Sequence, residues 1–313
     1  MMWRYIRRLG GVLALGTLFS LTLAQGSFMP APQRAYQALV NRDSAQAVSA
    51  YQLLGDPVTA LAHAQVIAAP EAVLLRQTAE LALGLRRWDI AQARLEQLLT
   101  AESDAAWANQ ALGLLLAVTD KQAALSHLQK AWDLDEIYAQ PVLIATLTDN
   151  TDARALAYQV GTTLAELEYY ALAEYAFAES AIFAASPAEA LASIGLMRAL
   201  QGLDYQRWVS QAGTLAPNSP EVHTLIGLAH RAASYPFDSL TEFLIALNLA
   251  PLDPEINAQL AEAYAVLGDV RSAAFWHGQA AILSGDAPRY VESYHAAQTA
   301  VPPDSLQAFP IAP

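Results

Sequence analysis

Six histidines are the residues of this sequence most able to carry acid–base or metal chemistry. No two of them have the spacing of an HExxH zinc motif, and the chain contains no cysteine that could complete a thiolate site. His223 and His230 lie on one helical face, but His230 occupies an aromatic position of the repeat defined below, so packing is the better interpretation. The six are His63, His127, His223, His230, His277 and His295.

Two groups of acidic residues could supply oxygen ligands to a cation. Asp133, Asp135 and Glu136 close a predicted helix, and Asp149 and Asp152 lie in a turn-rich segment. A calcium site needs a fuller oxygen shell and a suitably placed glycine, which neither group has. We interpret both groups as solvated loop acids and predict no metal site.

Motifs of nucleophilic and nucleotide chemistry are also absent from the sequence. It contains no GxSxG, GxGxxG or GxxxxGK[ST] segment. The absence of cysteine excludes disulfides, thiol catalysis and lipidation on cysteine. We therefore predict a protein that is not an enzyme, with no catalytic residue and no cofactor.

Composition and charge restrict the class of partner. Hydrophobic residues make up 54% of the 313 residues, and Ala and Leu dominate them, which favours helices. The formal net charge is −13, from 17 basic and 30 acidic residues. Such a chain repels phosphate backbones, so we predict no binding to nucleic acid.

The amino terminus has the three-part layout of a secretory signal peptide. Arg4, Arg7 and Arg8 precede an uncharged, mostly apolar run from Leu9 to Leu23, and small residues lie at the two positions that a signal peptidase inspects before Gln25. We predict a signal over residues 1–24 and a periplasmic or secreted protein; an uncleaved amino-terminal anchor stays open. No second apolar run approaches membrane length, so we predict no membrane span after cleavage.

Near the carboxyl end the sequence repeats itself. Segments that begin at Pro220 and Pro254 align without a gap at an offset of 34 residues. In the second copy, apolar residues three or four apart form one stripe, Gly268-Asp269 breaks it, and a second stripe follows. Each copy thus predicts a helical hairpin, which buries its faces only by stacking on neighbours.

The same template recurs upstream. With a weaker first copy, it predicts about seven hairpins over most of the mature chain. The expected divisions are a signal peptide at 1–24, amino-terminal repeats at 25–136, a bend at 137–153, carboxyl-terminal repeats at 154–285, a capping helix at 286–300 and a Pro-rich tail at 301–313.

This pattern resembles the tetratricopeptide repeat family. The family's small, aromatic, alanine and closing proline positions have counterparts in the last two copies, although Ser239 and His277 depart from the motif. The counterparts are Gly227, Phe243, Ala246 and Pro251 in one copy, and Tyr264, Ala273 and Ala280 in the next. The resemblance implies an all-α, right-handed α-solenoid of about seven hairpins with a carboxyl-terminal capping helix.

The resemblance also implies that the first helices of the hairpins line a concave binding groove. A lysine-based clamp for a terminal carboxylate is not expected, because Lys121 and Lys130 fall outside this surface. The mixed groove suits an extended peptide or a partner helix. The implied groove residues are Arg76, Glu80, Trp107, Gln110, Leu114, Tyr158, Thr162, Thr224, Leu228, Arg231, Ala258 and Glu262.

Three hypotheses for function follow. The first is an exported scaffold or adaptor that mediates protein–protein interactions in a bacterial envelope, in assembly or secretion. The alternative is a periplasmic helical-repeat protein that binds a small molecule or glycan, for which the tyrosines around Tyr169 would be available. The third is an enzyme built on the helical array, since fold does not fix function. The identity of the protein or peptide partner and the oligomeric state do not follow from the sequence.

Overall fold

The structure is a computed structural model that describes residues 34, 38, 44–67, 70–149, 153–184 and 186–301. Over these residues all regular elements are helices. The predicted signal peptide at 1–24 and the predicted tail from residue 302 onward lie outside the described residues. The chain divides into two compact units, residues 1–69 and 70–313.

The described part of the first unit is one helical hairpin, α3 (Ser44–Leu53) and α4 (Pro57–Gln65). Gly55 turns the chain between the helices with a φ of 72°, and the Asp56 carboxylate caps α4 by accepting from the Thr59 backbone N–H at 3.0 Å. The rings of Tyr51 and His63 stack across the hairpin at 5.4 Å. This is the weakest repeat of the sequence, and it still folds as a hairpin.

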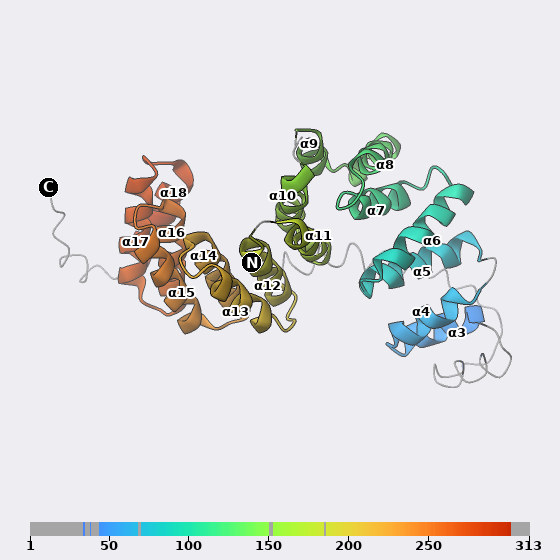
Figure 1. Cartoon of the computed structure of the whole chain (residues 1–313), viewed down its shortest axis with the longest axis horizontal. Helices are drawn as coiled ribbons and strands as arrows, with labels where there is room; N and C mark the ends of the chain where they lie inside the picture. Colours follow the sequence, from blue (N-terminus) through green and yellow to red (C-terminus); the bar gives the residue numbers. More distant parts are fainter. Residues whose placement is uncertain are drawn as a thin grey trace. The chain divides into compact units, whose positions relative to one another are not determined.

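The second unit is itself built from helical hairpins (Figure 1). In each hairpin the two helices pack on each other, and neighbouring hairpins pack together except where a further helix lies between two of them. The six pairs are α5 (Ala72–Gly84) with α6 (Trp88–Ala101), α7 (Ala106–Leu116) with α8 (Lys121–Leu134), α10 (Ala153–Glu166) with α11 (Tyr170–Phe183), α12 (Ala188–Leu200) with α13 (Gln206–Leu215), α14 (Pro220–Ala232) with α15 (Pro236–Leu249), and α16 (Pro254–Val266) with α17 (Val270–Leu283).

Three elements of the second unit stand outside these pairs. The short 3-10 helix η2 (Glu136–Tyr138) and helix α9 (Pro141–Asp149) lie between α8 and α10 in the chain; η2 packs on α7 and α8, and α9 packs on α8 and α10. Helix α18 (Pro288–Ala300) packs on α17, where Tyr290 is buried against Ala280 and Ala281. Over the described residues, the predicted all-α solenoid of helical hairpins is therefore confirmed, and helix α18 follows the last hairpin of the second unit.

Glycines set the closeness of the two helices within a hairpin. A Cβ atom on Gly227 would lie 2.7 Å from the ring of Phe243, and one on Gly161 would lie 2.8 Å from the ring of Phe177. Each ring comes from the second helix of the same hairpin and is buried. The small residue of the repeat is thus needed where the aromatic side chain of the partner helix fills the interface.

The turn inside a hairpin usually contains one residue with left-handed backbone. Glycine fills that position at Gly202 and Gly268, with φ of 68° and 81°. Arg86, Glu168 and Ser234 fill it in three other hairpins, with φ of 57°, 64° and 65°. A residue with a side chain adopts this conformation at a higher cost than glycine does.

A polar residue in the first turn of a first helix fastens the preceding loop. Asn109 donates to the carbonyl of Ser103 at 3.1 Å, and Asn257 donates to the carbonyl of Pro251 at 3.2 Å. The ring of His223 lies 3.0 Å from the equivalent carbonyl of Pro217 through Nε2. Three buried polar side chains thus repeat one contact, which joins the first helix of each of these three hairpins to the loop before it.

Candidate functional site

The larger surface cleft beside predicted groove residues lies between α5, α6 and α7. It has a volume of about 390 Å³ and receives Tyr138 from η2. Its wall combines apolar, aromatic and charged groups, as binding clefts do. The lining residues are Ala72, Val73, Arg76, Leu98, Glu102, Ala105, Ala106, Trp107 and Tyr138.

Arg76 and Trp107 form the centre of this cleft. The guanidinium carbon of Arg76 lies 4.9 Å from the centroid of the Trp107 ring, within cation–π range. The Nε atom of Arg76 also pairs with Glu80 Oε1 at 3.0 Å, one helical turn away. Trp107 is only partly buried and Arg76 is exposed, so both present surface to a ligand.

The fold holds Trp107 in place through the loop between α6 and α7. Asn109, two residues after Trp107, donates to the carbonyls of Ser103 and Ala105, each at 3.1 Å. The Asn109 side-chain oxygen lies 3.0 Å from Nδ1 of His127 on α8. Burial lowers the pKa of His127, and Lys130 lowers it further, which favours a neutral ring that can donate to the amide.

A second group of predicted residues lies on α14 and α16. Arg231 places its guanidinium carbon 5.8 Å from the centroid of the Phe243 ring. Its Nη1 atom is buried and has no hydrogen-bond partner within the described part of the chain. Burial lowers the pKa of Arg231, while the negative charges of Glu262 and Glu255 act in the opposite direction.

Thr224 and Leu228, both on α14, differ in the surface that they present to a ligand. Thr224 donates its hydroxyl to the carbonyl of Pro220 at 2.8 Å, so its donor serves its own helix. Leu228 packs against the core formed by Phe243 and Leu260 and is only half-buried. Of the two, Leu228 therefore offers apolar surface, and Thr224 offers no free hydroxyl proton.

Glu262 lines a smaller cleft at the carboxyl-terminal end, between α16, α17 and α18. This cleft has a volume of about 240 Å³, and Glu262 Oε1 lies 3.6 Å from Nε2 of His277 within it. His277 is 5% exposed, and its Nδ1 atom has no partner in the described structure. Burial lowers the pKa of His277, and Glu262 opposes the shift.

The other predicted groove residues, on α7 and α10, range from buried to exposed. Leu114 is 5% exposed and packs into the core, so little of its side chain can meet a ligand. Tyr158 contacts the Phe177 ring at 5.2 Å and Ser193 at 3.4 Å; burial raises its pKa. Thr162 donates to the carbonyl of Tyr158 at 3.1 Å, and Gln110 is half-buried on α7.

Sequence periodicity predicted no role for Tyr138 or Gln259. Tyr138 enters the larger cleft from a segment that carries no repeat pattern, so periodicity gives no position for it. Gln259 on α16 donates to Glu255 at 2.6 Å, but its buried oxygen has no partner within the described residues. A polar residue within an apolar stripe was the available signal for Gln259.

Over the part of the chain that the structure describes, no group of three or more His, Cys, Asp or Glu residues could hold a metal ion. Within the same residues, no helix is long and apolar enough to cross a bilayer.

No family model and no curated protein matches the sequence. Solved structures of several tetratricopeptide proteins are similar. One from Thermus thermophilus is 19% identical over 62% of this chain and 100% of its own, with a TM-score of 0.42. One from Parabacteroides merdae is 12% identical over 84% of this chain and 99% of its own, with a TM-score of 0.41. YrrB, described as a tetratricopeptide protein with an unusual peptide-binding site, is 16% identical over 65% of this chain and 97% of its own, with a TM-score of 0.37.

Proposed function

We propose that the chain is a non-catalytic scaffold that binds an extended peptide or a partner helix in the cleft between α5, α6 and α7. The observation that carries this proposal is the half-exposed Trp107 ring beneath the exposed guanidinium of Arg76. Tryptophan and arginine are among the residues most enriched at energetic centres of protein interfaces.

The chemistry of the cleft favours a segment with an apolar residue and a nearby charge. Val73 and Leu98 supply apolar wall, while Glu102 and Arg76 place opposite charges at the cleft. A peptide side chain that covers Trp107 would add to the existing cation–π pair without displacing it. Arg231 and Glu262, on α14 and α16, are proposed as a second contact region of the same partner.

The proposed cellular role is an adaptor in a bacterial envelope, acting in assembly or secretion. Support comes from the amino-terminal sequence, whose basic residues and apolar run have the layout of an export signal. A periplasmic or secreted location is part of this proposal.

Site-specific photocrosslinking tests the binding proposal. A benzophenone amino acid replaces Val73, which lines the cleft and is 68% exposed, and a control places it at Val142 on α9, which is 51% exposed. We expect a defined protein to be captured from envelope extracts at position 73 and not at position 142. Trp107→Ala and Arg76→Gln should abolish capture, and Trp132→Ala, on exposed surface of α8, should retain it.

Equal capture at both positions, or capture that survives Trp107→Ala, would contradict the peptide-binding proposal.

The alternative, a small-molecule or glycan binder, has one favourable observation. The partly exposed rings of Trp107 and Tyr138 line one cleft and could cover a sugar ring. A thermal-shift screen with peptidoglycan fragments separates the two proposals, because a ligand that binds the folded state raises the unfolding temperature.

A further inference from the structure

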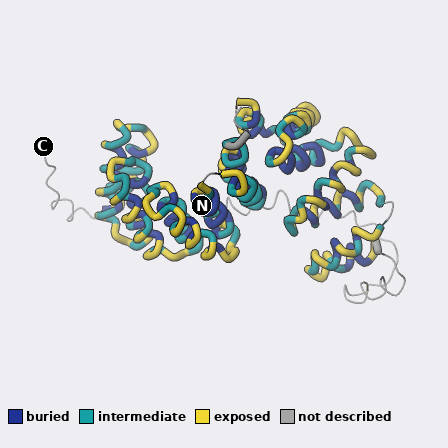
Figure 2. Tube along the Cα trace, in the orientation of Figure 1, coloured by how far each residue is buried: buried dark blue, intermediate teal, exposed yellow. Residues whose placement is uncertain are grey.

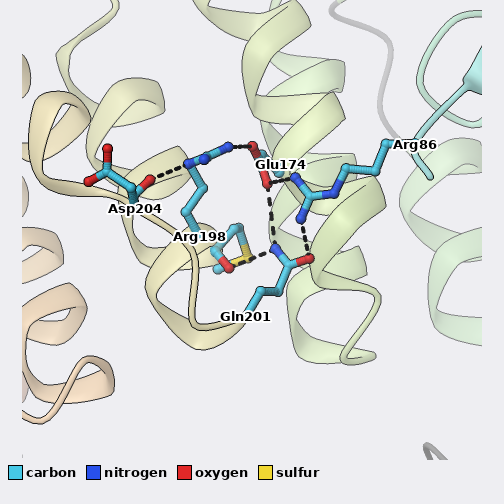
Figure 3. A network of polar contacts seen from close by, with 6 residues as sticks. Arg86, Glu174, Arg198, Gln201 and Asp204 are labelled. Atoms are coloured by element: carbon cyan, nitrogen blue, oxygen red, sulfur yellow. Dashed lines mark hydrogen bonds and ion pairs between the residues drawn. The ribbon is translucent and has the colours of Figure 1, made fainter. Parts of the chain in front are cut away.

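A network of polar contacts joins the turns of three hairpins in the second unit (Figure 3). Arg86 lies in the turn between α5 and α6, Glu174 lies near the start of α11, and Arg198 and Gln201 lie at the end of α12. Arg86 Nη1 pairs with Glu174 Oε2 at 2.6 Å, and Arg86 Nη2 donates to Gln201 Oε1 at 2.6 Å. These contacts span 88 and 115 residues of sequence.

Glu174 is the centre of the network. Its second oxygen, Oε1, pairs with Arg198 Nη1 at 2.8 Å, so two guanidinium groups share one carboxylate. The side chains of Glu174, Arg198 and Arg86 are 14%, 23% and 29% exposed. Charges that are this shielded from water are screened less by salt than surface charges are, and they depend strongly on their partners.

The protein fixes the far side of the network through backbone contacts. Arg198 Nε donates to the carbonyl of Asp204 at 2.6 Å, and Gln201 Nε2 donates to the carbonyl of Met197 at 2.8 Å. Figure 3 shows Arg86 reaching from its own hairpin toward this group. Arg198, Gln201 and Glu174 are thus preorganised, and Arg86 closes the network.

An aromatic contact supports the same junction. The ring of Trp88, two residues after Arg86, stacks on the ring of Tyr175, the neighbour of Glu174, at 5.7 Å with an interplanar angle of 23°. Among the described helices, α5 and α6 pack extensively only on each other and on α7. The junction with α11 and α12 therefore consists of a few side chains at the turns.

The backbone of Arg86 shows that this position is under constraint. Its φ of 57° is left-handed, a conformation that Gly202 and Gly268 adopt in other hairpins at lower cost. In this turn the sequence has an arginine instead, and its guanidinium makes two contacts of 2.6 Å to residues of other hairpins.

We infer that Arg86, Glu174, Arg198 and Gln201 form a clasp that holds the α5–α6 hairpin against α11 and α12 and that can open while every hairpin stays folded. The hairpin cores do not contain these four side chains. Opening therefore breaks ion pairs and one ring stack without exposing a core. The clasp sets whether the hairpins that carry the Arg76 cleft and those that carry Tyr158 keep one fixed arrangement.

Distance measurements between two spin labels test this inference. The chain has no cysteine, so Ala93→Cys on α6 and Ser210→Cys on α13, both at exposed positions, label uniquely. We expect one narrow distance distribution for the otherwise unchanged chain. Glu174→Gln should add a longer-distance population, because the two arginines then lack the negative charge that joins them.

Glu189→Gln provides the matched control, since Glu189 is an exposed acid on α12 outside the network. It should leave the distribution unchanged. If Glu174→Gln lowers the helical content, Arg86→Gln replaces it, because Arg86 lies in a turn and outside any core. The inference is overturned if Arg86→Gln and Glu174→Gln both leave the distance distribution of the folded chain as narrow as the control does.

Discussion

The α5–α7 region and the α14–α16 region each place an arginine beside an aromatic ring. In the first region, Arg76 is exposed, pairs with Glu80 and lies 4.9 Å from the partly exposed Trp107 ring. In the second, Arg231 has a buried nitrogen without a partner among the described residues and lies 5.8 Å from Phe243, which is 0% exposed.

The two regions show how similar pairs of side chains can serve either packing or binding. Phe243 fills the space that Gly227 leaves open within its hairpin, so its ring is committed to the core. Trp107 lies at the first turn of α7 and lines the cleft, so its ring stays partly open to water. In Figure 2 the buried residues gather where helices face each other. The Phe243 ring is buried because it lies against the facing helix, whereas the Trp107 ring lines a cleft and keeps contact with water.

Removal of each aromatic ring should give the largest difference in stability between the two regions. Phe243→Ala should lower the free energy of unfolding by about 3–5 kcal/mol, because it deletes a fully buried aromatic side chain and leaves a cavity against Gly227. Trp107→Ala should lower it by roughly 1–2 kcal/mol, because part of that ring already meets water. Urea unfolding followed by circular dichroism measures both, and equal losses would show that the Trp107 ring is as much a part of the core as Phe243 is.

The fold was predictable to a greater extent than the site. Apolar stripes, Gly268-Asp269 and the offset between Pro220 and Pro254 determine helices and turns through local chemistry, and the structure places hairpins there. Asp269 illustrates why, since its carboxylate accepts from the Ser272 backbone N–H at 3.0 Å and caps α17. Signals of this kind act within a few residues, so the sequence displays them directly.

The site depends on contacts between distant residues, which periodicity does not encode. Tyr138 reaches the cleft because η2 packs on α7 and α8, and Arg86 reaches Glu174 across 88 residues. The burial of Leu114 in the core is a further example, since the family pattern implied an accessible position and the packing of α7 leaves little of it exposed. The periodic pattern assigns a residue to one face of a helix, but the elements that pack on that helix determine whether the face is buried or exposed.

Acid should destabilise the fold through a buried histidine beside each region. His127 on α8 is bonded to Asn109 of the first region, whereas His277 on α17 has an Nδ1 atom without a partner in the described structure. Burial lowers the pKa of both below the usual 6.5. Above that value both the folded and the unfolded state are neutral, so stability should not change with pH through these groups. Below it the unfolded state binds protons first, so the free energy of unfolding should fall until the folded-state pKa is reached.

Replacing His277 by phenylalanine, the type of residue that the repeat expects there, should reduce this acid sensitivity. The measurement compares urea midpoints at about pH 7.5 and about pH 5.5, on either side of the ordinary histidine pKa. His295→Phe on α18 is the matched control, because His295 is exposed. A midpoint difference that stays the same in His277→Phe would mean that acid destabilisation arises from other groups.

The smallest change in stability is expected from the two arginines themselves. Arg76→Met should alter the free energy of unfolding by no more than about 0.5 kcal/mol, because an exposed pair within one helix contributes little. Arg231→Met should be neutral or stabilising, because it removes a partly buried charge whose Nη1 lacks a partner among the described residues while keeping apolar volume over Phe243. Capture at position 73 should fall more in Arg76→Met than in Arg231→Met, since Arg76 supplies the exposed cation of the cleft. Urea unfolding and crosslinking yield at position 73, measured on both variants, distinguish the two roles, and a clear loss of stability in Arg231→Met would show that its charge is compensated by Glu255 and Glu262 more strongly than its geometry indicates.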